Sequence, residues 1–376
     1  MNKKNVIVLM IDGGRLDRAK RSEFFRKLQS KSAFFSQSIT YGPHTIAAMH
    51  AIFSGCYGNR TGTDSYWSTY KFKKEKFKTI TEYLHEEGYY AQADIVNELV
   101  IPKQGFDEFL IHDEQKDDLT LRHIEMLRKM KEKNLQGKNF FIYLQYSNIH
   151  TGIMNQVLKV FDNFSPDYFN NRQLNEERYD SLFLNAENYL EKIFDTIQNL
   201  ELEKDSIILV MSDHGISVGE KVGERAYGAF CYDYTLITFT YFLLPGISPI
   251  EITQQIRTID FMPTILDFLE LDLDSNYDSL DGESLMPLIE GKSLKEKFAF
   301  SETANPLDQK SPPKEPNTKS IRTSKWKLIF NEYDDTKELY DLQNDPNEEK
   351  NLINQNLEIE NILWQELCFI IEKKAN

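Results

Sequence analysis

The feature of this 376-residue sequence that most constrains its fold is a series of short apolar runs that alternate with helix-forming segments. The clearest runs lie at residues 5–11, 139–147, 206–212 and 238–246. The segments between them, such as residues 118–134, place apolar side chains at helical spacing. Strands that are apolar on both faces are typical of a parallel sheet covered by helices on both sides. The sequence therefore predicts an α/β fold with a mostly parallel central sheet flanked by helices.

The regular alternation of apolar runs and helix-forming segments ends at about residue 290. Residues 305–319 hold four prolines and predict a loop. Beyond that loop, antiparallel strands are predicted at residues 320–331 and 337–342, and a closing helix at residues 356–374. We expect a catalytic domain over residues 1–290 and a small C-terminal α+β subdomain over residues 291–376.

Charge and cysteine usage limit the class of partner. The net charge of −15 argues against nucleic acid or an anionic membrane as the main partner. Three widely spaced cysteines favour neither a disulfide framework nor a thiolate zinc site. The N-terminal run "VIVLMI" is too short for a signal peptide or a membrane span. We expect a cytoplasmic protein with no membrane span, and leave a homo-oligomer open.

Two of the predicted strands end in groups that bind metals. Asp12 follows the first strand, and Asp213 and His214 follow the run at 206–212. Since the carboxyl ends of parallel strands meet at one edge of the sheet, we expect these side chains to lie together. Carboxylate and imidazole are ligands for a divalent cation, and three of them leave a coordination position open for catalysis. The alternative is that each residue caps a helix or pairs with a lysine.

The stretch "YGPHTIAAMHAIFSGCYGNRTG" offers two nucleophiles, Thr45 and Cys56. Thr45 begins an apolar helix pattern, where free backbone N–H groups and the helix dipole favour an anion. A metal beside its hydroxyl would activate it as a nucleophile, although a threonine here also suits a plain N-cap. Cys56 follows the far end of the helix, where the dipole disfavours a thiolate, so we interpret it as a packing residue.

Motifs in order along nearly the whole chain resemble the sulfatase branch of the alkaline phosphatase superfamily. They are "NVIVLMIDGGRLD", "TIAAMHAIFSGCYGNRTG", "TITEYLHEEGYYAQAD", "GFDEF", "MSDHGISVGE", "TIDFMPTILDFLEL", "DGESLMPLIEG", "IRTSKWKLI" and "ELYDLQNDPNEEKNL". The resemblance implies an alkaline-phosphatase-like sandwich, a nucleophile at Thr45 and a metal bound by Asp12, Thr45, Asp213 and His214.

The sequence departs from the sulfatase pattern where that pattern handles sulfate. The family's Cys/Ser-x-Pro-Ser-Arg motif falls on residues 45–49, so Thr45 replaces the residue that becomes formylglycine and Met49 replaces the arginine. The family's Gly-Lys-Trp-His falls on residues 95–98, which lack both its lysine and its histidine. The second aspartate of the family's opening Asp-Asp pair is Gly13 here. These departures argue against ordinary sulfatase chemistry.

A threonine with two aspartates and one histidine is similar to phosphorus-handling relatives: nucleotide pyrophosphatase/phosphodiesterases, phosphoethanolamine transferases and lipoteichoic acid synthases. The further histidine ligands of two-metal relatives are missing, since the later His-Gly falls on Tyr227-Gly228. The resemblance therefore implies one divalent metal. His214 favours zinc or manganese over calcium, with magnesium also open.

The hypothesis is a hydrolase or transferase that acts on a phosphodiester or phosphomonoester, a small molecule or glycan precursor, through a phospho-Thr45 intermediate. Backbone N–H groups of residues 46 and 47 would stabilise the developing charge. His150 would bind the phosphoryl group or protonate the leaving group, or else makes a structural hydrogen bond. Lys221 and Arg225 would face the substrate, or else lie on the solvated surface. A sulfuric ester hydrolase with an atypical nucleophile and an inactive homologue that binds a partner are the two alternatives.

Overall fold

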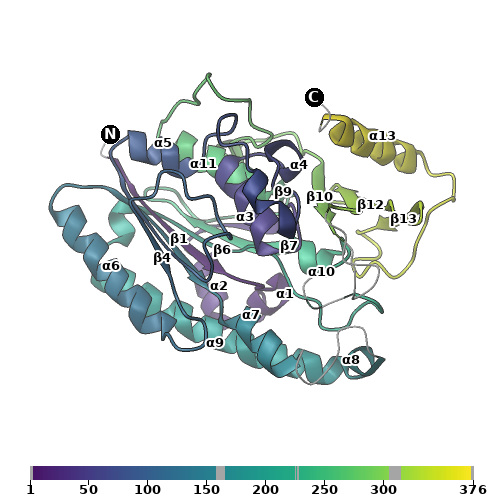
Figure 1. The fold of residues 1–376 in the computed structure, drawn as a ribbon, viewed down its shortest axis with the longest axis horizontal. Coiled ribbons are helices and arrows are strands. Elements are labelled where there is room, and N and C mark those ends of the chain that lie inside the picture. Colours follow the sequence, from purple (N-terminus) through teal and green to yellow (C-terminus); the bar gives the residue numbers. More distant parts are fainter. Residues whose placement is uncertain (1–2, 158–165, 225, 227, 305–314, 374–376) are drawn as a thin grey trace.

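The computed structural model describes residues 3–157, 166–224, 226, 228–304 and 315–373. The main sheet has nine strands in the order β4-β3-β5-β1-β6-β7-β2-β8, with β9 beside β2 (Figure 1). The strands are β1 Asn5–Ile11, β2 Ala33–Ile39, β3 Tyr90–Ile95, β4 Glu108–Ile111, β5 Phe140–Tyr146, β6 Ser206–Ser212, β7 Ile237–Leu243, β8 Ile250–Ile252 and β9 Ile256–Arg257.

The strands of this sheet are parallel to their neighbours except β7, which runs against both β6 and β2. The predicted α/β fold with a mostly parallel sheet is therefore confirmed. Strand β2 was not predicted. Its register with β7 shifts between Phe35 and Ser38, and the polar residues Ser36 and Gln37 at this irregularity interrupt the apolar pattern.

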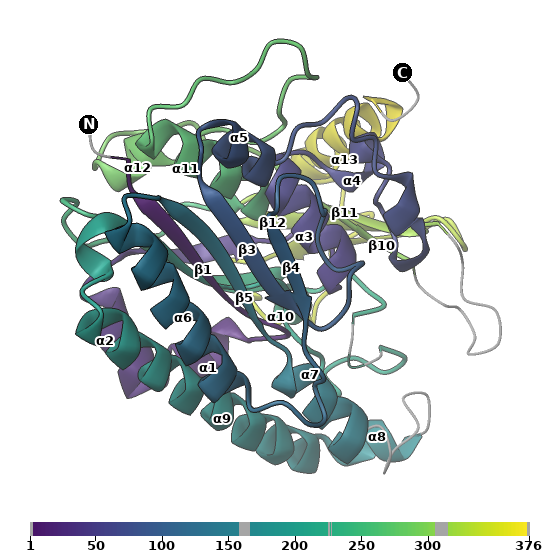
Figure 2. The same cartoon turned by 60° about the vertical axis from the view of Figure 1, so that its left-hand side comes forward.

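Helices cover both faces of the sheet. Strand β1 shows why: Ile7 and Leu9 lie in one apolar core, and Val6 and Val8 in the other. Figure 2 shows α2, α6 and α9 on the first face and α3, α5 and α11 toward the second. The helices are α1 Leu16–Ala19, α2 Glu23–Gln29, α3 Thr45–Ser54, α4 Gly58–Thr61, α5 Ile80–Glu86, α6 Leu119–Leu135, α7 Asn148–Gly152, α8 Pro166–Asn170, α9 Arg172–Asn199, α10 Asp233–Leu236, α11 Phe261–Phe268, α12 Met286–Ile289 and α13 Glu358–Glu372.

One predicted helix is wrong in its extent. The pattern of residues 17–32 predicts a single polar amphipathic helix, but α1 ends at Ala19 and α2 begins at Glu23. Ser22 separates them because its hydroxyl accepts a hydrogen bond from the backbone N–H of Phe25 and so caps α2.

The C-terminal part forms a second sheet, which is antiparallel throughout: β10 Ala299–Thr303, β11 Thr318–Arg322, β12 Trp326–Asn331 and β13 Thr336–Asp341. Phe300 and Leu328 of this sheet share a core with Ala51 of α3 and Leu363 of α13. Figure 1 shows this sheet and α13 together beside α3. The main sheet is thus joined to the smaller one through the helix that begins at Thr45. The domain boundary at residue 290 stays a prediction.

Most of the predicted proline-rich loop, residues 305–314, lies outside the described residues. Among the residues that are described, no helix combines the length and the apolar character that crossing a bilayer would require.

Candidate active site

Two neighbouring strands deliver the acidic side chains of the site. Strands β1 and β6 are parallel, and Ile11 at the end of β1 pairs with Ser212 at the end of β6. Asp12 and Asp213 therefore leave the sheet side by side, with His214 next in the chain. The three side chains are buried, and their ligand atoms lie within 4.8 Å of one another. The sequence prediction that they would lie together agrees with this arrangement.

Thr45 lies beside this cluster. Its hydroxyl oxygen is 3.3 Å from Oδ2 of Asp12 and 3.4 Å from Nε2 of His214. It is the first residue of α3, and the N-cap position before it is held by His44, whose Nδ1 accepts from the backbone N–H of Ala47 at 3.4 Å. The reading of Thr45 as a plain N-cap is therefore wrong, and its hydroxyl faces the acids instead.

The cap has a consequence for the expected anion-binding N–H groups. The N–H of Ala47 points to the His44 ring, so of the two backbone donors expected at residues 46 and 47, the second is already in use.

The imidazole of His214 presents a lone pair to the two carboxylates. Its Nδ1 is 2.7 Å from the carbonyl oxygen of Gly215, which can only accept, so Nδ1 carries the proton. In the neutral ring Nε2 is then the nitrogen with the free lone pair, and it lies 3.4 Å from Oδ2 of Asp213 and 3.7 Å from Oδ1 of Asp12. Three groups with lone pairs and no shared proton thus converge on one point.

The carboxylates are incompletely satisfied. Oδ1 of Asp12 and Oδ2 of Asp213 are buried without a hydrogen-bond partner among the described residues. Burial raises the pKa of Asp213 to about 6, against the effect of His214, and the nearby Asp12 raises it further. Buried orphan carboxylate oxygens are costly unless a cation lies between them. The residues present therefore fit a divalent metal held by Asp12, Asp213, His214 and Thr45.

The other oxygen of each carboxylate is held in place by the protein. Oδ1 of Asp213 accepts from the backbone N–H groups of Gly13 (3.1 Å) and His214 (2.9 Å). Oδ2 of Asp12 accepts from the side-chain amide of Gln145 at 2.9 Å. Sequence reasoning missed Gln145. The available signal was its position on β5, because Gln145 pairs with Met10 of β1, two residues before Asp12.

Gly13 occupies the position of the second aspartate in the Asp-Asp pair of the family motif. Its φ is +72°, and a Cβ atom there would lie 2.5 Å from Cδ1 of Ile216. The backbone of this turn therefore suits glycine, and its N–H serves Asp213 in place of a side chain.

Of the remaining predicted site residues, the structure describes His150 and Lys221. His150 is on α7, with Nδ1 3.9 Å from the carboxylate of Glu114. Lys221 donates to the main-chain oxygen of Glu348, and its ammonium lies 4.9 Å from the ring centre of Tyr232. This contact accounts for the lysine without a substrate. Arg225 lies outside the described residues.

Cys56 is buried beyond the far end of α3. Burial raises the pKa of its thiol to about 12, with a further contribution from Asp281. A thiol of this kind is a poor nucleophile at neutral pH, in agreement with its interpretation as a packing residue.

A second buried cluster was not predicted. Oδ2 of Asp94 is 3.2 Å from Nδ1 of His112 and 2.9 Å from Nε2 of His123, and Arg122 binds both carboxylate oxygens at 2.9 Å. The remaining ring nitrogens contact Ser147 Oγ (2.9 Å) and Tyr189 OH (2.7 Å). Burial alone would raise the pKa of Asp94, but the hydrogen bonds from His112, His123 and Arg122 hold it well below its ordinary value.

Two family models match the chain. The family model for "Sulfatase" matches residues 4–271, and the model "N-sulphoglucosamine sulphohydrolase, C-terminal" matches residues 229–373. A choline-sulfatase of Rhizobium meliloti (strain 1021) is 27% identical over 167 residues, and the match spans 43% of this chain and 30% of that protein.

Solved structures with the same fold extend over almost the whole chain. A putative sulfatase, yidJ, from Bacteroides fragilis has a TM-score of 0.77 at 17% identity, covering 100% of this chain and 97% of its own. BT4656 in complex with D-glucosamine-2-N,6-O-disulfate gives 0.76 at 16%, with coverage of 99% and 98%. A phosphonate monoester hydrolase from Silicibacter pomeroyi gives 0.72 at 16%, with coverage of 99% and 95%.

Proposed function

The chain belongs to the sulfatase family, and on that premise we propose that it is a metal-dependent hydrolase or transferase that attacks a phosphoester through Thr45. One observation carries the proposal: the Thr45 hydroxyl lies within 3.4 Å of both Asp12 and His214, in a cluster where one oxygen of each buried carboxylate has no hydrogen-bond partner among the described residues. Neutral hydroxyl groups need such an arrangement to act as nucleophiles.

The divalent metal would be held by four residues of the protein: Asp12, Asp213, His214 and Thr45. The imidazole of His214 favours zinc or manganese. When bound, the metal supplies positive charge that lowers the pKa of the threonine hydroxyl and draws electron density from the phosphoryl group.

In the first half of the reaction, Thr45 Oγ1 forms a bond to phosphorus as the bond to the leaving oxygen breaks. Oδ2 of Asp12, 3.3 Å away, accepts the hydroxyl proton. The leaving oxygen takes a proton from His150 in this proposal, and Nδ1 of that ring lies 3.9 Å from the carboxylate of Glu114. Water or an acceptor hydroxyl then displaces the phosphoryl group from Thr45.

The positions that handle sulfate in the family pattern support phosphorus rather than sulfur. Met49 is fully buried in the apolar core behind the sheet. Glu98 pairs with Lys103, and the backbone N–H of Val96 donates to Gln145 at 3.1 Å. None of these three side chains supplies a cation for a sulfate group.

The family match and the relatives named as sulfatases equally favour a sulfuric ester, so this is the second candidate. Parallel assays with an aryl phosphodiester, an aryl phosphate and an aryl sulfate separate the two. The proposal expects phosphoester turnover that Thr45→Ala lowers by at least about 1000-fold, while Thr45→Ser retains part of it. Aryl sulfate turnover as the only activity would overturn it.

An inactive homologue that binds a partner is separated by metal analysis. The proposal expects close to one metal per chain after soaking with zinc or manganese, and loss of this metal in Asp213→Asn. A wild-type chain that retains almost none, and turns over none of the three substrates, would favour the inactive homologue.

The proposal also places the enzyme in the cytoplasm. Cys56, Cys231 and Cys368 are all free thiols, which suits a reducing compartment.

A further inference from the structure

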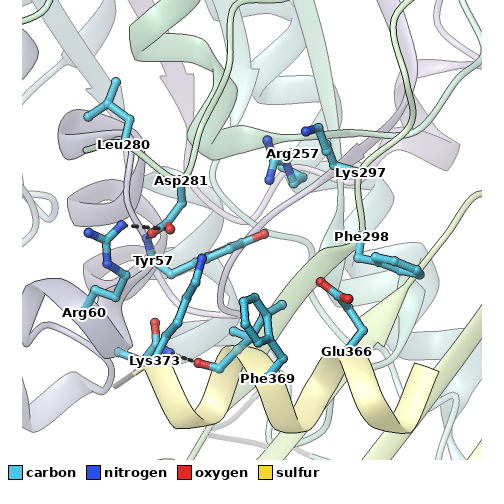
Figure 3. Close-up of a pocket in the computed structure, with 12 residues that line it drawn as sticks. Tyr57, Arg60, Arg257, Leu280, Asp281, Lys297, Phe298, Glu366, Phe369 and Lys373 are labelled. Atoms are coloured by element: carbon cyan, nitrogen blue, oxygen red, sulfur yellow. Dashed lines mark hydrogen bonds and ion pairs between the residues drawn. The ribbon is translucent and has the colours of Figure 1, made fainter. Parts of the chain in front are cut away.

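The two ends of α3 differ in how the charged side chains beside them are paired. Beyond its C-terminal end lies a cavity of about 210 Å³, where Arg60 binds Asp281 at 2.8 Å (Figure 3). At the N-terminal end, no described lysine or arginine pairs with Asp12, and a neutral side chain, Gln145, donates to its carboxylate. The orientation of Asp12 is therefore set by hydrogen bonds.

The side-chain amide of Gln145 is held at both of its ends. Gln145 lies fully buried on β5; its Nε2 donates to Oδ2 of Asp12 at 2.9 Å, and its Oε1 accepts from the backbone N–H of Val96 at 3.1 Å. A flipped amide would set its oxygen against the carboxylate and its NH₂ group against the N–H of Val96. Only one orientation forms both bonds, so the amide faces Asp12 as a donor.

This bond gives the two oxygens of Asp12 different surroundings. Oδ2 accepts from Gln145 and lies 3.3 Å from Oγ1 of Thr45. Oδ1 has no hydrogen-bond partner among the described residues and lies 3.7 Å from Nε2 of His214. Turning the carboxylate about its own axis would break the bond to Gln145. Oδ2 is thus directed at the nucleophile, and Oδ1 at the position that the metal would take.

The same amide joins Asp12 to the segment that follows β3. Val96 belongs to residues 95–98, on which the Gly-Lys-Trp-His of the family pattern falls. Here the backbone N–H of Val96 holds Gln145, and the side chain of Val96 packs against the apolar core of the second face. This segment therefore supports Asp12 with its backbone, a use that requires no basic side chain.

The neutral charge of Gln145 matters as much as its length. A lysine at this position would neutralise Asp12, as Arg122 neutralises Asp94 in the other cluster. A glutamate would bring a further negative charge against Asp12. The amide donates to Oδ2 and leaves the charge of Asp12 to a cation at Oδ1.

We propose that Gln145 is a positioning residue of the site, which orients Asp12 so that Oδ2 faces the Thr45 hydroxyl and Oδ1 faces the metal position. Gln145 acts through Asp12, and its effect on turnover rests on the proposed function. Hydrogen-bond partners of metal ligands contribute about 10- to 100-fold to metal affinity or activity.

Two substitutions of Gln145 in the full-length protein test this role, with zinc as the metal and an aryl phosphodiester as the substrate. Gln145→Met keeps the length of the side chain and removes both hydrogen bonds. Gln145→Glu keeps the acceptor for Val96 and replaces the donor with a carboxylate. The matched control is Gln92→Met, because Gln92 is a buried glutamine of the neighbouring β3 whose amide donates to Glu108 instead.

At saturating zinc, kcat should fall at least about tenfold in both Gln145 variants while KM changes less than about threefold, since Asp12 acts in the chemical step. Gln145→Met should also weaken zinc binding at least about tenfold, as measured by competition with a chelator. Gln92→Met should leave kcat, KM and zinc affinity within about twofold of the wild type. Thermal unfolding gives the folded fraction to which kcat refers, so lost stability alone does not lower it.

Wild-type kcat and zinc affinity in both Gln145 variants, or equal losses in Gln92→Met, would overturn the role of Gln145. A failure of the proposed function gives a different result. If Thr45→Ala keeps full activity, that mechanism fails, but zinc binding weakened in Gln145→Met and not in Gln92→Met still supports the orientation of Asp12. If Thr45→Ala and Asp213→Asn abolish turnover while the Gln145 variants match Gln92→Met, the mechanism stands and the positioning role fails.

Discussion

Two buried clusters in this protein contain the same kinds of side chain and differ in how their polar atoms are satisfied. Asp12, Asp213 and His214 form one, and Asp94, His112 and His123 form the other; in each, the ligand atoms lie within 4.8 Å of one another. In the second cluster Arg122, Ser147 and Tyr189 complete the hydrogen bonds. In the first, a carboxylate oxygen of each aspartate has no partner among the described residues.

The first cluster therefore has carboxylate oxygens available to a cation, whereas the second already contains a cation, the guanidinium of Arg122. Arg122 neutralises Asp94, so a divalent metal there would have to displace or oppose a guanidinium. Among the described residues, no lysine or arginine pairs with Asp12 or Asp213, and the nitrogen that faces them is Nε2 of His214, a metal-binding atom in the neutral ring. Counting hydrogen bonds thus distinguishes the clusters where residue types alone do not.

The largest contrast is expected from removing one carboxylate charge from the first cluster. Asp213→Asn should lower turnover at least about 100-fold, since even outer partners of metal ligands cost 10- to 100-fold. Its metal content should fall with it, as measured by elemental analysis of the purified protein. Retention of both metal and activity in Asp213→Asn would show that the first cluster is not the metal site.

An aspartate-to-asparagine substitution in the second cluster should lower the stability of the fold instead of the activity. Asp94→Asn leaves Arg122 without its buried partner and should lower the free energy of unfolding by about 3 kcal/mol. Metal content should stay at the wild-type level, and turnover per folded molecule should change little. Denaturant titration measures the first effect. A loss of metal in this variant would mean that the two clusters do not differ as described.

The clusters should also differ in their response to pH. Burial raises the pKa of Asp213 to about 6, so its carboxylate charge destabilises the folded metal-free protein at pH 7. Protonation removes that charge, and the free energy of unfolding therefore rises as pH falls from 7 to 5. The pKa of Asp94 is lowered, so its contribution is constant over that window and is lost only when pH falls below about 4. The Tm of metal-free protein should therefore rise as pH is lowered from 7 to 5, and this rise should be smaller in Asp213→Asn. An equal rise in both proteins would contradict the assignment.

The smallest effect is expected at the edge of the second cluster. Tyr189→Phe removes the hydroxyl that lies 2.7 Å from Nδ1 of His123 and should cost about 1 kcal/mol of stability, with activity unchanged. Denaturant titration beside a turnover assay checks both statements. A clear loss of turnover would show that the second cluster serves catalysis.

Much of the site could be predicted because it depends on local sequence and strand register. Asp12 and Asp213 follow apolar strands that turn out to be parallel neighbours, and the motif tail after α3 gave the place of Thr45. Strand β2 and the break between α1 and α2 were missed because a bulge and a serine cap interrupt the periodicity on which the prediction relied.

The second cluster could not be predicted because its parts come from distant elements. Asp94 ends β3, His112 follows β4, His123 lies on α6 and Tyr189 on α9. No spacing rule joins them, and only packing of the helices against the sheet brings them together. The role of His44 as the cap of α3 was missed for a related reason, since a histidine is an uncommon N-cap and Thr45 is the favoured residue type.

Whether Thr45 is the nucleophile can be read from mass spectrometry of the peptide that contains it, after metal-loaded protein is quenched during turnover of an aryl phosphodiester. We expect a phosphoryl adduct on Thr45 that is missing in Asp213→Asn. An unmodified peptide, together with undiminished turnover in Thr45→Ala, would contradict this expectation.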